Sequence, residues 1–157
     1  MSEGELENGQ LFFAHETPRE SQRRMIDDGI ETLKEGGFLL AAAPTGIGKT
    51  AAALASSLTV ANHYSFGKEI PKILFLTGRQ SQHRIVVDTI REINNRIPQG
   101  FSKIKLVDII GRRSMCKNVD SKGRCDCEQG VTEAERRFLR SGLEEFIHSK
   151  PMHVDQV

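Results

Sequence analysis

The sequence predicts an α/β protein: a parallel sheet with helices packed on it, incomplete within this chain, followed by a cysteine-bearing and mainly helical insertion. Three observations predict this class. Short apolar runs alternate with amphipathic segments between residues 19 and 110. A glycine-bearing turn joins the first apolar run to an alanine-rich segment, and all three cysteines follow the third run. Apolar runs separated by helical segments favour parallel pairing with right-handed crossovers.

The length and charge restrict the function. A chain of 157 residues is the size of one domain, and its net charge of +1 excludes a simple polybasic binder of nucleic acid or membranes. The charge is uneven, because residues 1–36 carry 9 acids and 4 bases whereas residues 68–124 carry 13 bases and 5 acids. We expect any anionic partner to meet the middle of the chain.

The N-terminal composition, the longest apolar stretch and the number of cysteines together indicate the cellular location. The first residues are acidic and polar, unlike a signal peptide. The apolar stretch Phe38–Pro44 is far shorter than the ~20 residues that cross a bilayer. An odd number of cysteines disfavours a disulfide framework. We therefore expect a soluble intracellular protein with no membrane partner, cytoplasmic in a prokaryote or nuclear in a eukaryote.

The first elements can be read in order from the N-terminus. Residues 1–16 are acidic and aperiodic, and we interpret them as a loosely packed lead-in. Apolar residues then recur at helical spacing from Arg19, and the pair Gly36-Gly37 predicts the helix end. The run Phe38–Ala43 is typical of a buried parallel strand.

The next elements repeat this alternation. Residues 49–64 are rich in alanine and leucine and predict a largely buried helix. Residues 72–77 predict a second strand, 81–96 a second amphipathic helix and 103–110 a third strand. Together, residues 17–111 form the expected α/β part of the chain.

The remaining residues, 112–157, form the start of the cysteine-bearing insertion. Residues 112–131 have almost no aliphatic side chains and cannot build a core alone. Residues 132–147 predict a helix, since Thr132 and Glu135 have the spacing of a capping box.

The turn A-P-T-G-I-G-K-T at residues 43–50 has the features of a phosphate loop. It lies between a predicted strand and a predicted helix, as that motif requires. Gly46 and Gly48 let consecutive amides turn toward phosphate oxygens. Lys49 would reach the β- and γ-phosphates, and the Thr50 hydroxyl would bind Mg²⁺. The alternative is a chance glycine turn.

Four stretches resemble the XPD-type (DinG/XPD) DNA helicases of superfamily 2. P-R-E-S-Q at residues 18–22 is similar to the family's Arg-x-x-Gln element, and residues 43–50 are similar to motif I. L-T-G-R-Q-S-Q at residues 76–82 resembles motif Ia, and G-R-R-S-M-C at residues 111–116 resembles the start of an iron–sulfur domain. The resemblance implies a RecA-like ATP-binding motor domain.

The resemblance also implies roles for particular residues. Gln22 is expected to contact the adenine, although it could be only an exposed helix residue. The residues expected to bind ATP, of which Lys49 and Thr50 would act in catalysis, are Gln22, Ala43, Pro44, Thr45, Gly46, Ile47, Gly48, Lys49 and Thr50. Arg79, Ser81 and Gln82 follow a strand end and are expected to contact single-stranded DNA. The alternative is that these three residues belong to a solvated loop with no ligand.

The cysteines indicate a metal site. Cys116, Cys125 and Cys127 lie in a basic segment that needs a metal to order it. By resemblance the metal would be a [4Fe–4S] cluster, whose fourth cysteine is absent from this chain. One alternative is a zinc site in which His148 or His153 supplies the fourth ligand. The other is that all three cysteines are free thiols.

We therefore expect the N-terminal part of an ATP-dependent 5′→3′ DNA helicase with Mg²⁺ and a cluster as cofactors. We expect no unwinding from this chain alone, because no D-E-A-H or related acidic motif occurs in it. The alternatives are a non-enzymatic, metal-bearing nucleic-acid binding module with a relic phosphate loop, and another P-loop ATPase with incidental cysteines.

Overall fold

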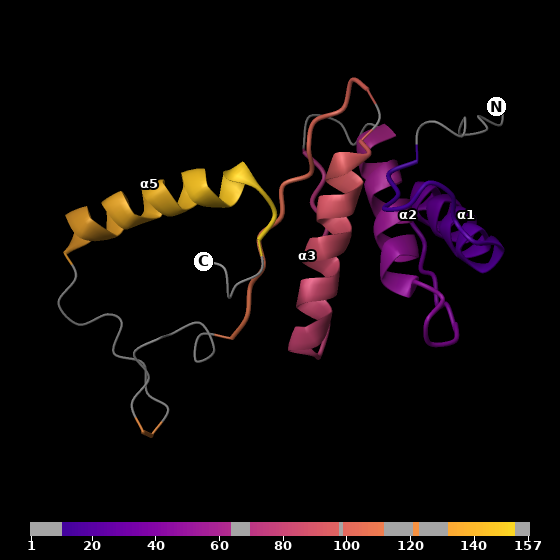
Figure 1. Cartoon of the computed structure of the whole chain (residues 1–157), viewed down its shortest axis with the longest axis horizontal. Coiled ribbons are helices and arrows are strands. Elements are labelled where there is room, and N and C mark those ends of the chain that lie inside the picture. The colour runs from indigo at the N-terminus through magenta and orange to yellow at the C-terminus, as the bar shows by residue number, and fades with distance from the viewer. Residues whose placement is uncertain (1–10, 64–69, 98, 112–120, 123–131, 153–157) are drawn as a thin grey trace.

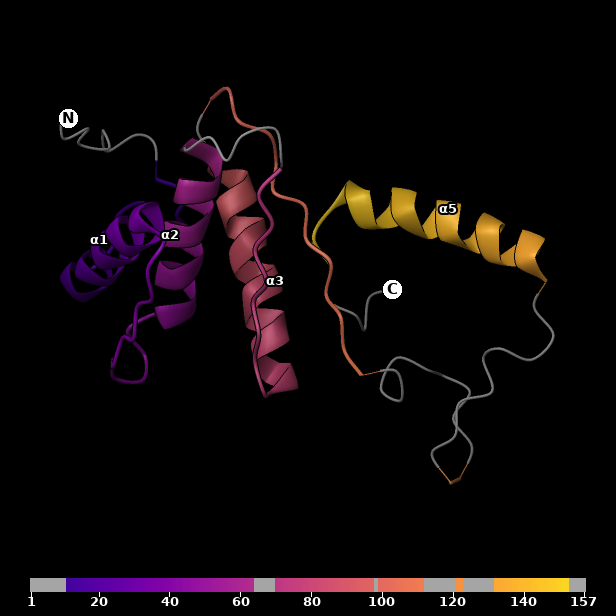
Figure 2. The same ribbon diagram turned by 180° about the vertical axis from the view of Figure 1, so that it is seen from behind.

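The computed structural model describes residues 11–63, 70–97, 99–111, 121–122 and 132–152 of the chain. In these ranges the regular elements are four helices: α1 (Glu20–Glu35), α2 (Lys49–His63), α3 (Gln80–Asn95) and α5 (Glu133–Ser149). Figure 1 shows α1, α2 and α3 side by side as one helical body, with α5 apart from them, and Figure 2 shows the same separation from behind.

Helix α1 confirms the predicted helix and its glycine stop. Gly36 adopts the left-handed conformation with φ 75°, and its backbone N–H turns back to the last carbonyls of the helix. The amide of Gly37 donates to Thr32 O over 2.9 Å. A residue with a side chain rarely adopts this backbone conformation, so glycine ends the helix at this position.

Helix α2 is the centre of the body, as its alanine-rich sequence predicted. It has buried residues on several faces and packs against α1 on one side and α3 on the other. Two clusters of buried side chains meet it. The α1 side is formed by Phe13, Ile26, Ile30, Ala51, Ala52, Ala55 and Val60. The α3 side is formed by Phe12, Ala14, Leu54, Leu58, Val86, Ile90 and Ile93.

The segment before α1 is part of this core. We interpreted residues 1–16 as loosely packed, and for residues 12–14 this was wrong, because all three are buried. Phe12 is completely buried, and its ring meets those of His63 and Phe101 edge-on at centroid distances of 5.8 and 5.1 Å. Its backbone amide donates to the Thr59 hydroxyl over 3.2 Å. The acidic composition of the N-terminus concealed the short apolar stretch that enters the core.

The predicted parallel sheet was wrong for the residues that the structure describes. Residues 38–43, 72–77 and 103–110 are not helical, but they form no strand, and no backbone hydrogen bond joins one to another within the described ranges. The run at 38–43 is not buried either: Phe38 is fully exposed, as is Leu40, and Leu74 of the second run is 82% exposed. An apolar run becomes a strand only if its amides and carbonyls form hydrogen bonds with a neighbouring backbone.

The third of these segments is held to α3 by side chains. The Asn94 amide group donates to Ile104 O over 2.9 Å, and its carbonyl oxygen accepts from Ile104 N over 2.7 Å. One asparagine thus satisfies both backbone groups that a neighbouring strand would otherwise take. Nearer the start of α3, His83 Nδ1 lies 2.6 Å from Asp108 Oδ1. These two attachments align residues 104–108 antiparallel to α3.

Helix α5 begins where the capping-box spacing predicted. The Thr132 hydroxyl accepts from Glu135 N over 3.3 Å, while the Glu135 carboxylate accepts from Thr132 N over 2.8 Å. Phe138 of this helix is 78% exposed. Of the helices that the structure describes, none is long and apolar enough to span a bilayer.

Candidate phosphate site

The turn between residue 43 and α2 has the backbone that its glycines predict. Gly46 and Gly48 have φ values of 88° and 84°, while every other described residue of this turn has negative φ. Ala43, which occupies the first glycine position of the general motif, therefore has an ordinary backbone conformation. The turn leads directly into α2, where the first amide with a carbonyl partner is that of Ala52, which donates to Gly48 O over 3.1 Å. The amides before it are those that helices direct at anions.

The Lys49 side chain folds back over this turn. Its ammonium group donates to Ala43 O over 3.0 Å and to Pro44 O over 2.8 Å. Both acceptors are exposed backbone carbonyls rather than carboxylates, so the positive charge has no counter-ion among the described residues. Thr50, the predicted Mg²⁺ ligand, is the next residue along α2.

Gln22 is adjacent to the same turn. Its side chain is only 4% exposed, and its Oε1 atom accepts from Arg19 N over 3.0 Å. A Cβ placed on Gly48 would collide with Gln22 Nε2. The positive φ of Gly48 favours glycine at this position, and any side chain there would also displace the Gln22 amide group. The structure thus places Gln22 against the turn, and its predicted contact with adenine remains a prediction.

A cavity of about 960 Å³ opens beside the turn. Its walls are the first half of α1, the segment 39–44 and Ile47. The lining combines apolar side chains such as Leu39 and Leu40 with charged side chains of both signs: Arg19, Glu20, Arg24 and Asp28. Its volume lies in the range of about 300–1,000 Å³ that is usual for small-molecule sites. Sequence reasoning missed this cavity, because its two walls are not adjacent in the chain.

The residues predicted to contact DNA lie at the N-terminal end of α3. Arg79 is the N-cap residue in extended conformation, and Ser81 and Gln82 belong to the first turn. All three side chains are exposed. Figures 1 and 2 show that α2 and α3 run in the same direction, so this end of α3 lies on the same side of the body as the phosphate turn. The partly buried pair of His83 and Asp108, which the sequence did not reveal, attaches this end of α3 to the segment 104–108.

The predicted metal ligands lie outside the described residues. This holds for Cys116, Cys125 and Cys127 and for the alternative ligand His153, while for His148 only the backbone, within α5, is described. Within the described ranges no group of His, Cys, Asp and Glu side chains could hold a metal ion. The iron–sulfur and zinc alternatives thus remain predictions.

Comparison of the chain with protein-family models, with curated proteins and with solved structures found no significant match in any of the three.

Proposed function

We propose that residues 43–50 bind the β- and γ-phosphates of ATP together with Mg²⁺. The observation that carries this proposal is the Lys49 ammonium group, which lies over a turn with two positive-φ glycines at the N-terminus of a buried helix. A phosphate oxygen is a stronger acceptor for an ammonium group than a neutral carbonyl is. On binding, Lys49 would exchange its two carbonyl partners for phosphate oxygens.

The chemistry of the turn fits both ligands. Backbone amides and one lysine suit phosphate oxygens, and the Thr50 hydroxyl suits Mg²⁺, which prefers oxygen ligands and retains several waters. The neighbouring cavity supplies apolar walls for the base, and its charged lining residues include two bases and two acids, so its net formal charge is balanced. In this proposal Gln22 is a positioning residue, because it supports the turn at Gly48.

The proposal is tested by equilibrium binding to the full chain. We expect ATP with Mg²⁺ to bind, and Lys49→Ala to weaken it by about tenfold or more, which corresponds to about 1.4 kcal/mol. AMP should bind much more weakly than ATP, because it lacks the phosphates that the turn would contact. Lys72→Ala, which removes an exposed lysine outside both the turn and the cavity, is the matched control.

Two results would contradict the proposal. One is equal affinity of the wild type and Lys49→Ala for ATP, with helical content by circular dichroism unchanged. The other is equal affinity for ATP and AMP, which would mean that the base cavity binds and the turn does not.

We further propose, on the motifs described above, that this site belongs to the ATP-binding part of a 5′→3′ DNA helicase of the XPD type. The exposed Arg79, Ser81 and Gln82 on the same side of the body support a single-stranded DNA contact there. Replacing Arg79 by alanine should weaken binding of a single-stranded oligonucleotide and leave ATP affinity unchanged. Unchanged oligonucleotide affinity would contradict this role.

A further inference from the structure

A second cavity, of about 320 Å³, lies in another part of the molecule. Its walls come from the C-terminal half of α3, from residues 102–105 and from residues 149–151 at the end of α5. None of its lining residues lines the cavity beside the phosphate turn. It brings residues 149–151 together with two segments that lie more than 40 residues earlier, between residues 91 and 105.

The lining of this cavity is strongly basic. Lys103, Lys105 and Lys150 contribute to its walls, and no aspartate or glutamate does. All three lysines are exposed. Within the described part of the chain, none of the three has an ion pair with a carboxylate. Ammonium groups gathered in one hollow repel one another, so an anion bound between them is favoured.

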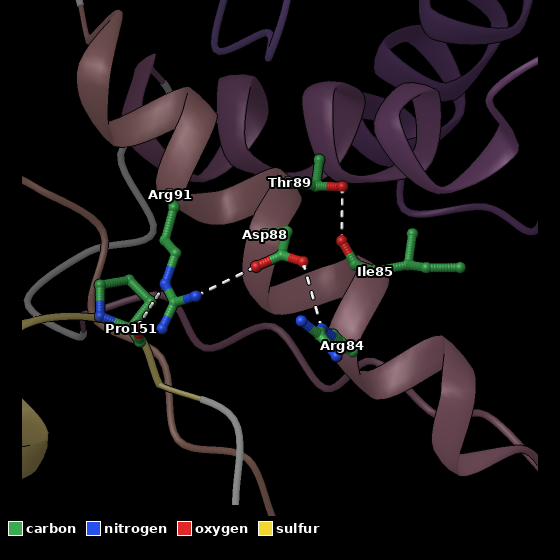
Figure 3. Close-up of polar contacts among 6 residues, drawn as sticks. All are labelled: Arg84, Ile85, Asp88, Thr89, Arg91 and Pro151. Atoms are coloured by element: carbon green, nitrogen blue, oxygen red, sulfur yellow. Dashed lines mark hydrogen bonds and ion pairs between the residues drawn. The ribbon is translucent and has the colours of Figure 1, made fainter. Parts of the chain in front are cut away.

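The walls are held by hydrogen bonds that leave the lysines available. Arg91 Nε donates to Pro151 O over 2.9 Å, and Arg91 Nη1 donates to Asp88 Oδ1 over 3.0 Å. Figure 3 shows the Arg91 side chain between these two acceptors, with Arg84 on the other side of Asp88. Arg91 therefore anchors residue 151 to α3, and Asp88 balances part of the local arginine charge.

The other wall is fixed by Asn94, whose two hydrogen bonds hold the backbone of Ile104 against α3. The residues on either side of Ile104 are Lys103 and Lys105. Pro151 and Met152 are buried and hold the chain beside Lys150. The backbone at all three lysines is thus held in place before any ligand arrives, which lowers the entropic cost of binding.

We propose that this cavity is a second anion site that binds a phosphate group, distinct from the phosphate turn. Lysines bind phosphate as point charges, and the Ser102 hydroxyl and Asn95 amide in the lining are neutral donors for further phosphate oxygens. The phosphate comes either from a small free ligand or from a nucleic-acid strand, and both sources share this chemistry.

The test uses the full chain and two probes, inorganic pyrophosphate and a short single-stranded oligothymidylate. The variant Lys103→Gln, Lys105→Gln and Lys150→Gln removes the three charges. A control of equal net charge replaces Lys34, Lys72 and Arg140 by glutamine, and these lie outside the cavity. Both variants are measured in the Lys49→Ala background, so that the phosphate turn does not contribute.

We expect the cavity variant to lose affinity for pyrophosphate by about tenfold or more and the control to retain it. Loss of pyrophosphate affinity alone identifies a small free phosphate ligand, and loss of both affinities identifies a strand. Equal binding of both probes by the cavity variant and the control overturns the proposal. If the triple variant loses helical content, the single variant Lys150→Gln, whose side chain is exposed, gives the same comparison.

Because these measurements are made without Lys49, the proposal does not depend on the nucleotide site. Failure of ATP binding at the turn would leave the result at this cavity unchanged.

Discussion

Helices α2 and α5 are of similar length but are stabilised in different ways. Helix α2 has buried residues on several faces and packs against both α1 and α3. Helix α5 lies apart from that body, and the contacts described for it are mostly within the helix, such as its capping box and the ion pair between Arg137 and Glu133. The stability of α2 therefore depends mainly on tertiary packing, whereas that of α5 depends mainly on interactions within the helix.

The largest expected effect concerns the core around α2. Phe12→Ala should destabilise the protein by about 3–5 kcal/mol, because it removes a completely buried ring. Phe138→Ala on α5 should cost less than about 0.5 kcal/mol, since that ring is largely exposed. Urea unfolding followed by circular dichroism measures both. Similar losses for the two phenylalanines would show that α5 is packed as tightly as α2.

The next effect compares two glycines that are replaced by alanine. A Cβ on Gly29 of α1 would lie 2.8 Å from Ser56 Oγ and 2.9 Å from Ser56 Cβ on α2. Gly29→Ala should therefore be destabilising, because overpacking of about 1–3 kcal/mol exceeds the gain in helix propensity.

Gly142 of α5 has no neighbouring atom within 4 Å of the added Cβ. Gly142→Ala should stabilise α5 by about 0.5–1 kcal/mol, because alanine loses less backbone entropy than glycine. Helical content and urea midpoints of the two variants should change in opposite directions. A destabilising Gly142→Ala would show that α5 packs closely against another part of the chain.

The last comparison concerns the N-terminus of α5. Thr132→Ala should cost about 1 kcal/mol of helix stability, because the cap of the Glu135 amide is lost. Ser141→Ala, which removes a hydroxyl inside the same helix, is the control. The readout is helical content by circular dichroism.

The same cap should respond to pH. Hydrogen bonds from the Thr132 side chain and backbone lower the pKa of Glu135 from its usual 4.5. A lowered pKa in the folded helix means that this stabilisation is fully present above about pH 4.5 and is lost as pH falls through the lower, folded value. Thr132→Ala should reduce this pH dependence, and an unchanged titration of helicity would contradict the role of the cap.

The helices were the predictable part of this protein. The stop at Gly36, the start at Lys49 and the cap at Thr132 each depend on residues within one helical turn, so the sequence contains both partners. The sheet was not predictable, because a strand needs a backbone partner from elsewhere. Residues 38–43 have the composition of a buried strand, but that partner is missing within the described ranges and the run is exposed.

The candidate sites, too, contain features that depend on local sequence and features that depend on tertiary packing. The sequence by itself determined the backbone of the turn at residues 43–50, since Gly46 and Gly48 lie within these eight residues. Only the tertiary structure decided that Phe12 enters the core, that Gln22 lies against Gly48, and that Lys150 shares one cavity with Lys103 and Lys105. Local conformation depends on neighbours along the chain, whereas burial and the gathering of charge depend on which remote segments pack together.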